Sequence, residues 1–257
     1  MLNKGVLQVF IKTGMYENEI GRLEFTRAGP LYMSKIDASG SAVDQDESSL
    51  VGVPGSVVTD LRSRSRVIPA EFTFVDIGTA VQRDRIAAVF EPLLWGVLTI
   101  YTENDEYTMD CRPQEAPVFV RDKDIDYLWS FDIDFYAPYP YWRRGQERSF
   151  NGGIGTSVIR SKTINRTPVK ITYQAGDSGM LQINGAQMTI SNTHSKAITI
   201  NTEDLTVIDS DGNSVYDIID IATYPIEDMV MNYGDNEILI SGSVPVIRWH
   251  ELARSFF

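Results

Sequence analysis

The sequence predicts a mainly β protein of two domains, and three observations support this fold class. Apolar and polar residues alternate with a period of two in many short segments, most clearly from Trp129 to Tyr136, as in strands with one buried face. Pro138 and Pro140 end that strand, and a glycine-rich stretch at 151–155 follows, which is typical of a domain edge. A chain of 257 residues can also bury two hydrophobic cores.

The acidic composition and the single cysteine restrict the possible functions. The chain carries 23 basic and 35 acidic residues, a formal net charge of -12, which argues against non-specific binding to nucleic acids or anionic membranes. Cys111 is the only cysteine, so no intrachain disulfide can form and assembly in a reducing cytoplasm is expected. Residues 1–13 lack the apolar core of a signal peptide, and no later run is long enough to span a bilayer.

The first 75 residues are expected to form strands around one loop. Alternation predicts strands at 7–11 and 23–25, and a further short strand at 32–36. The segment 39–55 is rich in Ser, Gly, Asp and Glu, which is typical of a solvated loop. A longer strand is predicted from 57 to 74 because alternation resumes there.

Three arginines in the predicted strand at 57–74 are candidate interaction residues. Alternation places Arg62, Arg64 and Arg66 on one face of that strand. This face fits a solvent-exposed edge strand whose charges prevent aggregation, and it fits equally an arm that reaches the next subunit. In the second case the arginines would meet acidic residues of the preceding loop. Those acidic residues are Asp44, Asp46 and Glu47.

One helix is predicted, at about 79–91. Thr79 followed by Gln82 fits a capping box, and Pro92 marks the end because it disfavours a helical conformation at the residue before it. The helix is expected to cover one face of the first sheet through apolar residues at helical spacing. These residues are Ile86, Val89, Phe90 and Leu93.

Three short strands are expected after the helix, at 98–101, 107–111 and 118–120. Cys111 shares a face with Tyr107 in the second of them, so it is interpreted as a buried hydrophobe rather than a nucleophile.

The strand from Trp129 to Tyr136 should bury its apolar face and present Asp132 and Asp134 on the other. The segment after it is a predicted domain junction, and its aromatic rings admit two interpretations. They pack between the two domains, which is the preferred interpretation, or a rigid proline-rich segment holds them exposed to stack on sugars. The junction residues are Pro138, Tyr139, Pro140, Tyr141 and Trp142.

The second half is predicted to be a linker at 146–160 followed by an all-β domain at 161–257. Asn184-Gly185 between alternating apolar residues is a strong hairpin signal. A turn is expected at 234–236. Strands are expected at 169–173, 181–183, 188–190, 198–200, 205–207, 215–219, 237–240 and 244–249, at spacings typical of a sandwich.

The candidate motifs for metal binding or catalysis each lack a required residue or spacing. Asp209 to Asn213 has alternating oxygen ligands like a calcium loop, but Ser214 stands where glycine is required, so an Asp-Gly turn is the better interpretation. The glycines at 153–155 lack the rest of a dinucleotide motif. His194 and His250 are the only histidines, and their spacing indicates no site. No catalytic, metal or cofactor site is therefore predicted.

The junction and the order of elements resemble the distal tail (Dit) proteins of long-tailed bacteriophages. A strand ending in an aromatic residue, then Ala137, a spacer, Pro140-Tyr141 and Trp142, is similar to the Dit junction between a ring-forming domain and a smaller β-sandwich. The order of helix, the sequence 92–98, hairpin and strand at 129–136 is similar to the Dit ring domain, and the second half is similar to a galectin-like domain.

This resemblance implies an N-terminal ring-forming β-sandwich with one helix at 1–145, an arm or belt hairpin at about 37–74, and a C-terminal galectin-like β-sandwich. It further implies a non-enzymatic, structural virion protein of the tail tip, a baseplate hub assembled in the bacterial cytoplasm as a hexamer. Implied partners are the tail tube protein, a tail-associated baseplate protein and in some cases a receptor-binding protein. A carbohydrate-binding module or adhesin is the alternative. Candidate ring contacts are Asp44, Asp46, Glu47, Arg62, Arg64, Arg66, Asp132 and Asp134.

Overall fold

The computed structural model describes residues 13–37, 43–49, 56–63, 65–76, 80–164, 166–220 and 226–254, and in the ranges 43–49 and 56–63 it describes backbone strands. The chain forms two compact units. Unit 1 comprises Met1–Arg143 with Arg254–Phe257, and unit 2 comprises Arg144–Ala253. None of the helices described is long and apolar enough to cross a membrane.

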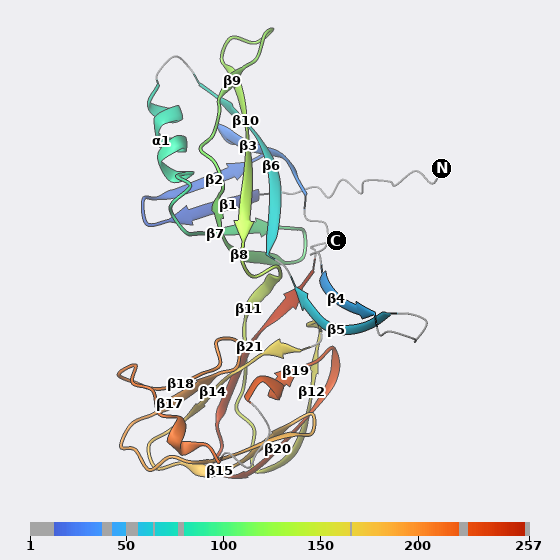
Figure 1. Cartoon of the computed structure of the whole chain (residues 1–257). Coiled ribbons are helices and arrows are strands. Elements are labelled where there is room, and N and C mark those ends of the chain that lie inside the picture. The colour runs from blue at the N-terminus through green and yellow to red at the C-terminus, as the bar shows by residue number, and fades with distance from the viewer. Residues whose placement is uncertain are drawn as a thin grey trace. The chain divides into compact units, whose positions relative to one another are not determined.

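The core of unit 1 consists of two antiparallel sheets that join at one corner, and β4 and β5 form a separate two-stranded sheet (Figure 1). One sheet has the order β2-β1-β7-β8, and the other has the order β3-β6-β10-β9. They join where Phe135 and Tyr136 of β10 pair with Pro113 and Arg112 of β8. The elements are β1 (Thr13–Asn18), β2 (Arg22–Thr26), β3 (Leu31–Ile36), β4 (Val43–Ser49), β5 (Ser56–Ser63), β6 (Arg66–Val75), α1 (Val81–Val89), β7 (Gly96–Tyr101), β8 (Glu106–Pro113), β9 (Val120–Arg121) and β10 (Leu128–Ala137).

Aromatic rings fill the space between these two sheets. Phe72 of β6 lies 5.0 Å from Phe131 of β10 and 5.3 Å from Phe25 of β2, measured between ring centroids. Tyr16 of β1 meets Phe135 of β10 at 5.3 Å. All five side chains are buried, and such ring pairs stabilise a core beyond the area that they bury.

Helix α1 covers this core but is shorter than predicted. It spans Val81–Val89 and buries Ile86 and Val89. Phe90, which follows the helix, is also buried and packs on Phe72 and Phe131. Leu93 was expected on the buried face but is 77% exposed, because the chain has left the helix before Pro92. Thr79 of the predicted capping box lies outside the described residues.

The segment 39–74 differs from its prediction in two ways. The expected loop at 39–55 contains strand β4, which pairs with β5 as a hairpin. The single strand expected at 57–74 is two strands, β5 and β6, that end and begin on either side of residues 64–65. Strand β6 pairs with β3 and β10, so its first residue, Arg66, belongs to the core sheet and not to the hairpin.

Unit 2 is a β-sandwich whose two sheets have the orders β18-β17-β14-β21 and β12-β20-β15-β16. The division between the units falls within β11, and of the predicted linker at 146–160 only residues 151–154 lie outside a strand. The elements are β11 (Trp142–Phe150), β12 (Gly155–Ser161), β13 (Thr167–Pro168), β14 (Lys170–Tyr173), β15 (Ser178–Ile183), β16 (Ala186–Ser191), β17 (Ile198–Asn201), β18 (Thr206–Asp209), η1 (Tyr216–Ile218), η2 (Ile226–Asp228), β19 (Val230–Met231), β20 (Gly234–Gly242) and β21 (Val246–Ala253).

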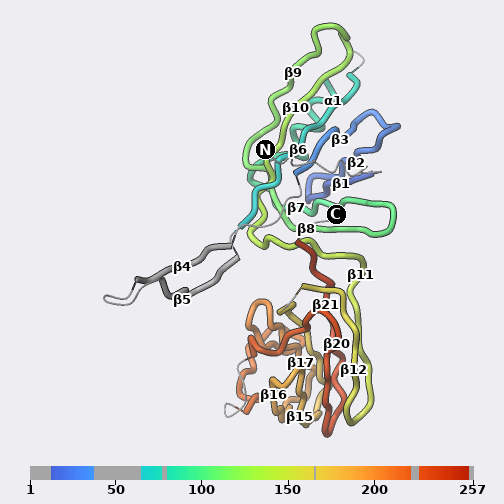
Figure 2. Tube along the Cα trace, turned by 90° about the vertical axis from the view of Figure 1, so that its right-hand side faces the viewer, coloured from blue at the N-terminus to red at the C-terminus, as the bar shows by residue number. Residues whose placement is uncertain are grey.

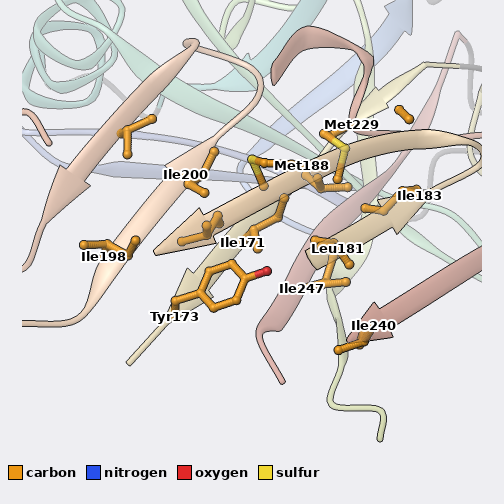
Figure 3. Close-up of a cluster of buried hydrophobic side chains, with 14 of the residues drawn as sticks. Ile171, Tyr173, Leu181, Ile183, Met188, Ile198, Ile200, Met229, Ile240 and Ile247 are labelled. Carbon is orange, nitrogen blue, oxygen red and sulfur yellow. The ribbon is translucent and has the colours of Figure 1, made fainter. Parts of the chain in front are cut away.

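Aliphatic side chains form most of the core of unit 2 (Figure 3). Ile171 and Tyr173 of β14 face this core together with Leu181 and Ile183 of β15, and all four are fully buried. The period-two alternation predicted for these segments is confirmed. Residues 215–219 were predicted to be a strand but contain the 3-10 helix η1. Val215 immediately before it and Ile218 within it are buried, at a spacing of three.

Two turns in unit 2 depend on asparagine. Asn184 and Gly185 both have positive φ, 51° and 90°, as a two-residue hairpin between β15 and β16 requires. Residues 234–236 were predicted to be a turn but are the first residues of β20, and the bend precedes them at 232–233. Asn236 bonds back to that bend. Its fully buried amide accepts hydrogen bonds from the Asn232 N–H at 2.7 Å and from Asn184 Nδ2 at 2.8 Å, and it donates to the carbonyl oxygens of Asn232 and Gly234. These bonds fix the two turns to each other.

Candidate interaction surfaces

The outer face of β10 and β6 carries an acidic strip, defined as Glu71, Asp132 and Asp134. The alternation predicted for β10 is confirmed from Phe131 onward, since Phe131, Ile133 and Phe135 are buried and both aspartates are exposed. Register places Asp132 directly opposite Glu71, and like charges at such positions repel. Lys35 offsets part of this charge because its Nζ lies 2.7 Å from Glu71 Oε1, and that hydrogen bond raises the pKa of Lys35. A basic partner surface would relieve the remaining repulsion.

An aromatic row, defined as Trp95, Arg112 and Tyr136, crosses the same outer face at the other end of β10. Arg112 and Tyr136 are register partners on β8 and β10, and Trp95 immediately precedes β7. The Arg112 guanidinium carbon lies 5.4 Å from the Trp95 ring centroid and 5.9 Å from that of Tyr136, which is cation–π geometry. Its Nη1 donates to the Pro92 carbonyl oxygen at 3.1 Å. The row is thus held rigid without being covered, and Trp95 is 52% exposed.

Arg66 was predicted to lie on an exposed face of its strand but is buried. It is only 5% exposed, and its Nη1 donates to the carbonyl oxygens of Arg254 at 3.0 Å and Pro140 at 3.4 Å. Burial lowers the pKa of Arg66. The prediction was wrong on this point because the chain starts a new strand there, so Arg66 supports the fold of unit 1 from within.

The other charged candidates lie on the β4–β5 hairpin. Asp44, Asp46 and Glu47 are on β4, and register places Asp44 opposite Arg62 of β5. Arg64 lies outside the described residues. Their role as ring contacts stays a prediction.

The junction residues are partly buried. Trp142 is completely buried, and the Arg66 guanidinium carbon lies 5.9 Å from its ring centroid. Tyr139 and Tyr141 form an edge-on pair at 5.3 Å between centroids. Pro140 is buried, whereas Pro138 is exposed.

One ion pair was not anticipated from the sequence. Asp76, at the end of β6, is buried, and its Oδ2 lies 2.9 Å from Nε of Arg83 on α1. The Arg83 guanidinium carbon stands 4.6 Å from the Trp129 ring centroid. The cluster connects α1 to β6 and β10. The only signal for it in the sequence is the run of polar residues at the start of α1.

The residues that were considered as metal ligands or as a nucleophile have structural roles. Asp209 Oδ1 accepts hydrogen bonds from the N–H groups of Asp211 and Asn213, both at 2.9 Å, and bonding to Asn213 lowers the pKa of Asp209. Cys111 is buried, as predicted, and burial raises the pKa of its thiol. Within the described ranges, no group of three His, Cys, Asp or Glu residues is placed to hold a metal.

Comparison with known proteins identifies the fold. No family model and no curated protein sequence matches the chain. Among solved structures, the Dit protein (gp 19.1) of phage SPP1, described as a paradigm of the hub adsorption apparatus of phages that infect Gram-positive bacteria, matches with a TM-score of 0.68 and 12% identity. The match covers 93% of this chain and 99% of that protein.

A chain of the activated baseplate of phage P2 with calcium matches with a TM-score of 0.50 and 10% identity, over 95% of this chain and 98% of that one. The predicted mainly β fold is confirmed, and the chain has the fold of the SPP1 Dit protein over almost the full length of both.

Proposed function

We propose that this chain is a structural protein of a phage tail tip, a baseplate hub that joins the tail tube to the host-adsorption apparatus. The observation that carries this proposal is the fold likeness to the SPP1 Dit protein, because it includes both units and nearly every residue of both chains. A match confined to one β-sandwich would carry little weight, since that architecture serves many functions.

In this proposal the functional oligomer is a closed ring, which contains six copies by analogy with the Dit proteins. A ring requires a heterologous interface, in which one surface of each subunit meets a different surface of the next. The acidic strip on β10 and β6 is one such surface, and Arg62 and Arg64 supply basic side chains for the other. A stable contact of this kind should bury more than roughly 1,000 Å² in total.

The proposed partners are the tail tube protein on one side of the ring, a tail-associated baseplate protein on the other, and a receptor-binding protein at the periphery. The proposed location is the virion, after assembly in the host cytoplasm. The role needs no catalysis, and the carboxylates that an enzyme would require are spread over solvated strand faces such as that of Asp132 and Asp134.

Binding of carbohydrate through the junction aromatics is less well supported. Trp142 exposes no ring surface on which a sugar could stack, and Tyr139 and Tyr141 are half-buried against each other. A glycan screen that detects binding abolished by Tyr141→Ala, with the fold unchanged, would restore this alternative.

The proposed function is tested by the mass of the purified chain in solution. Light scattering at several concentrations and two salt levels should show a species near six times the chain mass of 28.9 kDa, or a monomer that builds it as concentration rises. Electron microscopy of that species should show rings. A chain that stays monomeric at every concentration would contradict self-assembly.

A further inference from the structure

Unit 1 has an exposed surface with the composition of a protein-binding hot spot. The aromatic row unites Trp, Arg and Tyr, the residue types most enriched in such hot spots. Exposed apolar residues flank it: Leu93 precedes Trp95, and Val67 is the cross-strand neighbour of Tyr136. Packing and cation–π contacts already fix the three side chains, so little conformational entropy would be lost when a partner binds.

Arg112 carries a charge that nothing in the described part of the chain neutralises. Its guanidinium contacts two rings and one carbonyl oxygen, and its Nε is buried without a hydrogen-bond partner there. Four other arginines of unit 1 lie within ion-pair distance of a carboxylate: Arg22, Arg83, Arg121 and Arg143. An arginine that packs beside two aromatic rings is well suited to receive a carboxylate. The row therefore fits a partner that presents an acidic group among apolar ones.

The connection that leads into β10 has that composition. This segment, residues 118–127, is called the tip, and in Figures 1 and 2 it projects from the end of unit 1 where β9 and β10 meet. Its exposed apolar residues include Val118, which is 75% exposed, Val120 and Tyr127. Such a concentration of exposed apolar groups on a protruding loop is typical of an interaction site.

Hydrogen bonds within the tip leave one carboxylate available. Asp122 Oδ1 accepts from the N–H groups of Asp124 and Ile125, at 2.8 Å and 2.9 Å. Asp126 pairs with Arg121 at 3.0 Å. Asp124 is exposed, and its carboxylate has no partner in the described ranges. The tip thus presents a free carboxylate beside apolar side chains, on a backbone that its other aspartates hold in shape.

The tip and the aromatic row lie at opposite ends of one strand. The tip leads into Leu128 and the row includes Tyr136, so about 27 Å of extended β10 separates them at roughly 3.4 Å per residue. They cannot meet within one subunit. We propose that the tip of one copy packs on the aromatic row of the next, with Asp124 pairing with Arg112.

This contact is heterologous, as a ring requires, and it specifies a partner for one face of the proposed hub. It rests on the proposed function, since it assumes that copies of the chain assemble. It also adds an apolar anchor to an interface whose other candidate residues are charged. Charged rim contacts mainly set orientation and association rate, whereas buried aromatic and arginine anchors hold a complex together.

A charge exchange on the full-length chain tests the contact. Arg112→Glu and Asp124→Arg each place like charges together, and each should weaken association at least about tenfold, measured by light scattering over a concentration series. The double variant R112E/D124R restores an opposite pair in every contact, so it should recover most of the lost association. Arg160→Glu makes the same charge change on exposed β12 of unit 2 and should associate like the wild type.

The outcomes separate this contact from the proposed function. If the wild type and both single variants assemble equally, the tip does not bind the row, while the hub proposal stands. If the wild type never assembles, the hub proposal fails and this contact fails with it. Because Arg112 packs against two rings, R112E requires a check of its fold by circular dichroism. Asp124→Arg changes only an exposed side chain and is decisive if R112E misfolds.

Discussion

The cores of the two units contain different kinds of side chain, mainly aromatic in unit 1 and mainly aliphatic in unit 2. Unit 1 relies on a few large rings, with the Phe131 ring centroid within 6 Å of those of four other phenylalanines. Unit 2 packs many branched aliphatic side chains, and a hydrogen-bond network centred on buried Asn236 fixes its turns. A core of few large groups loses much when one is removed. A core of many small groups loses little per residue and depends more on the polar bonds that fix its turns.

The largest effect should follow from removing a ring at the centre of unit 1. Phe131→Ala leaves a cavity facing Phe72 and Phe90, and we expect the free energy of unfolding to fall by about 3–5 kcal/mol. Urea unfolding followed by circular dichroism measures this. Ile133→Val in the same strand is the control and should cost about 0.5–1.5 kcal/mol. Equal losses in the two variants would show that the rings are not the main support.

The asparagine network should be the most sensitive point of unit 2. Asn236→Ala leaves the Asn232 N–H and the Asn184 amide without their acceptor, and the expected loss is about 2–3 kcal/mol. Hydrogen exchange should locate the loss at β15, β16 and β20. Asn201→Ala removes a half-buried asparagine that bonds locally to Glu203 and Asp204, and it should cost less than about 1 kcal/mol.

Replacing either of two buried tyrosines by phenylalanine should change the free energy of unfolding by a smaller amount, and in opposite directions in the two units. Tyr16 donates to the Leu94 carbonyl oxygen at 3.3 Å, so Tyr16→Phe in unit 1 should cost about 0.5–1.5 kcal/mol. The Tyr173 hydroxyl in unit 2 is buried without a partner in the described ranges, so Tyr173→Phe should be neutral or slightly stabilising. A clear loss from Tyr173→Phe would mean that its hydroxyl has a partner, such as a bound water.

The smallest effect concerns alkaline pH. Burial raises the pKa of Tyr173 above its ordinary value near 10, so the folded state holds this proton more tightly than the unfolded chain. Stability should therefore be full below about pH 10 and decline above it. Tyr173→Phe should flatten the decline in unit 2. An unchanged slope in melting experiments from pH 8 to 11 would assign the decline to other groups.

The sequence predicted the elements whose signal is local. Strand β10 was identified because Phe131, Ile133 and Phe135 alternate with exposed residues, and the turn at Asn184-Gly185 because only a few residue types adopt its positive φ angles. The predicted strand at 57–74 combines β5 and β6, because alternation alone does not show where one strand ends and the next begins. Pairing of β6 with β10 places Arg66 in the buried sheet.

The candidate interaction surfaces were only partly predictable. Asp132 and Asp134 follow from alternation within one strand, but the aromatic row joins Trp95, Arg112 and Tyr136, which lie far apart in the sequence. Only the register of β8 with β10 brings them together, and register depends on tertiary packing. No sequence pattern predicts such a row. The position of Arg112 between two buried residues of β8 indicates only that its charge faces outward.

The isolation of Cys111 makes the protein easy to study with chemical probes. Its sulfur is completely buried and its thiol resists ionisation, whereas maleimide and similar reagents attack exposed thiolates. A cysteine introduced at an exposed position would thus be the sole reactive thiol, and the native residue would not need to be removed first. Fluorophores or spin labels could then report distances between neighbouring copies in an otherwise unmodified chain.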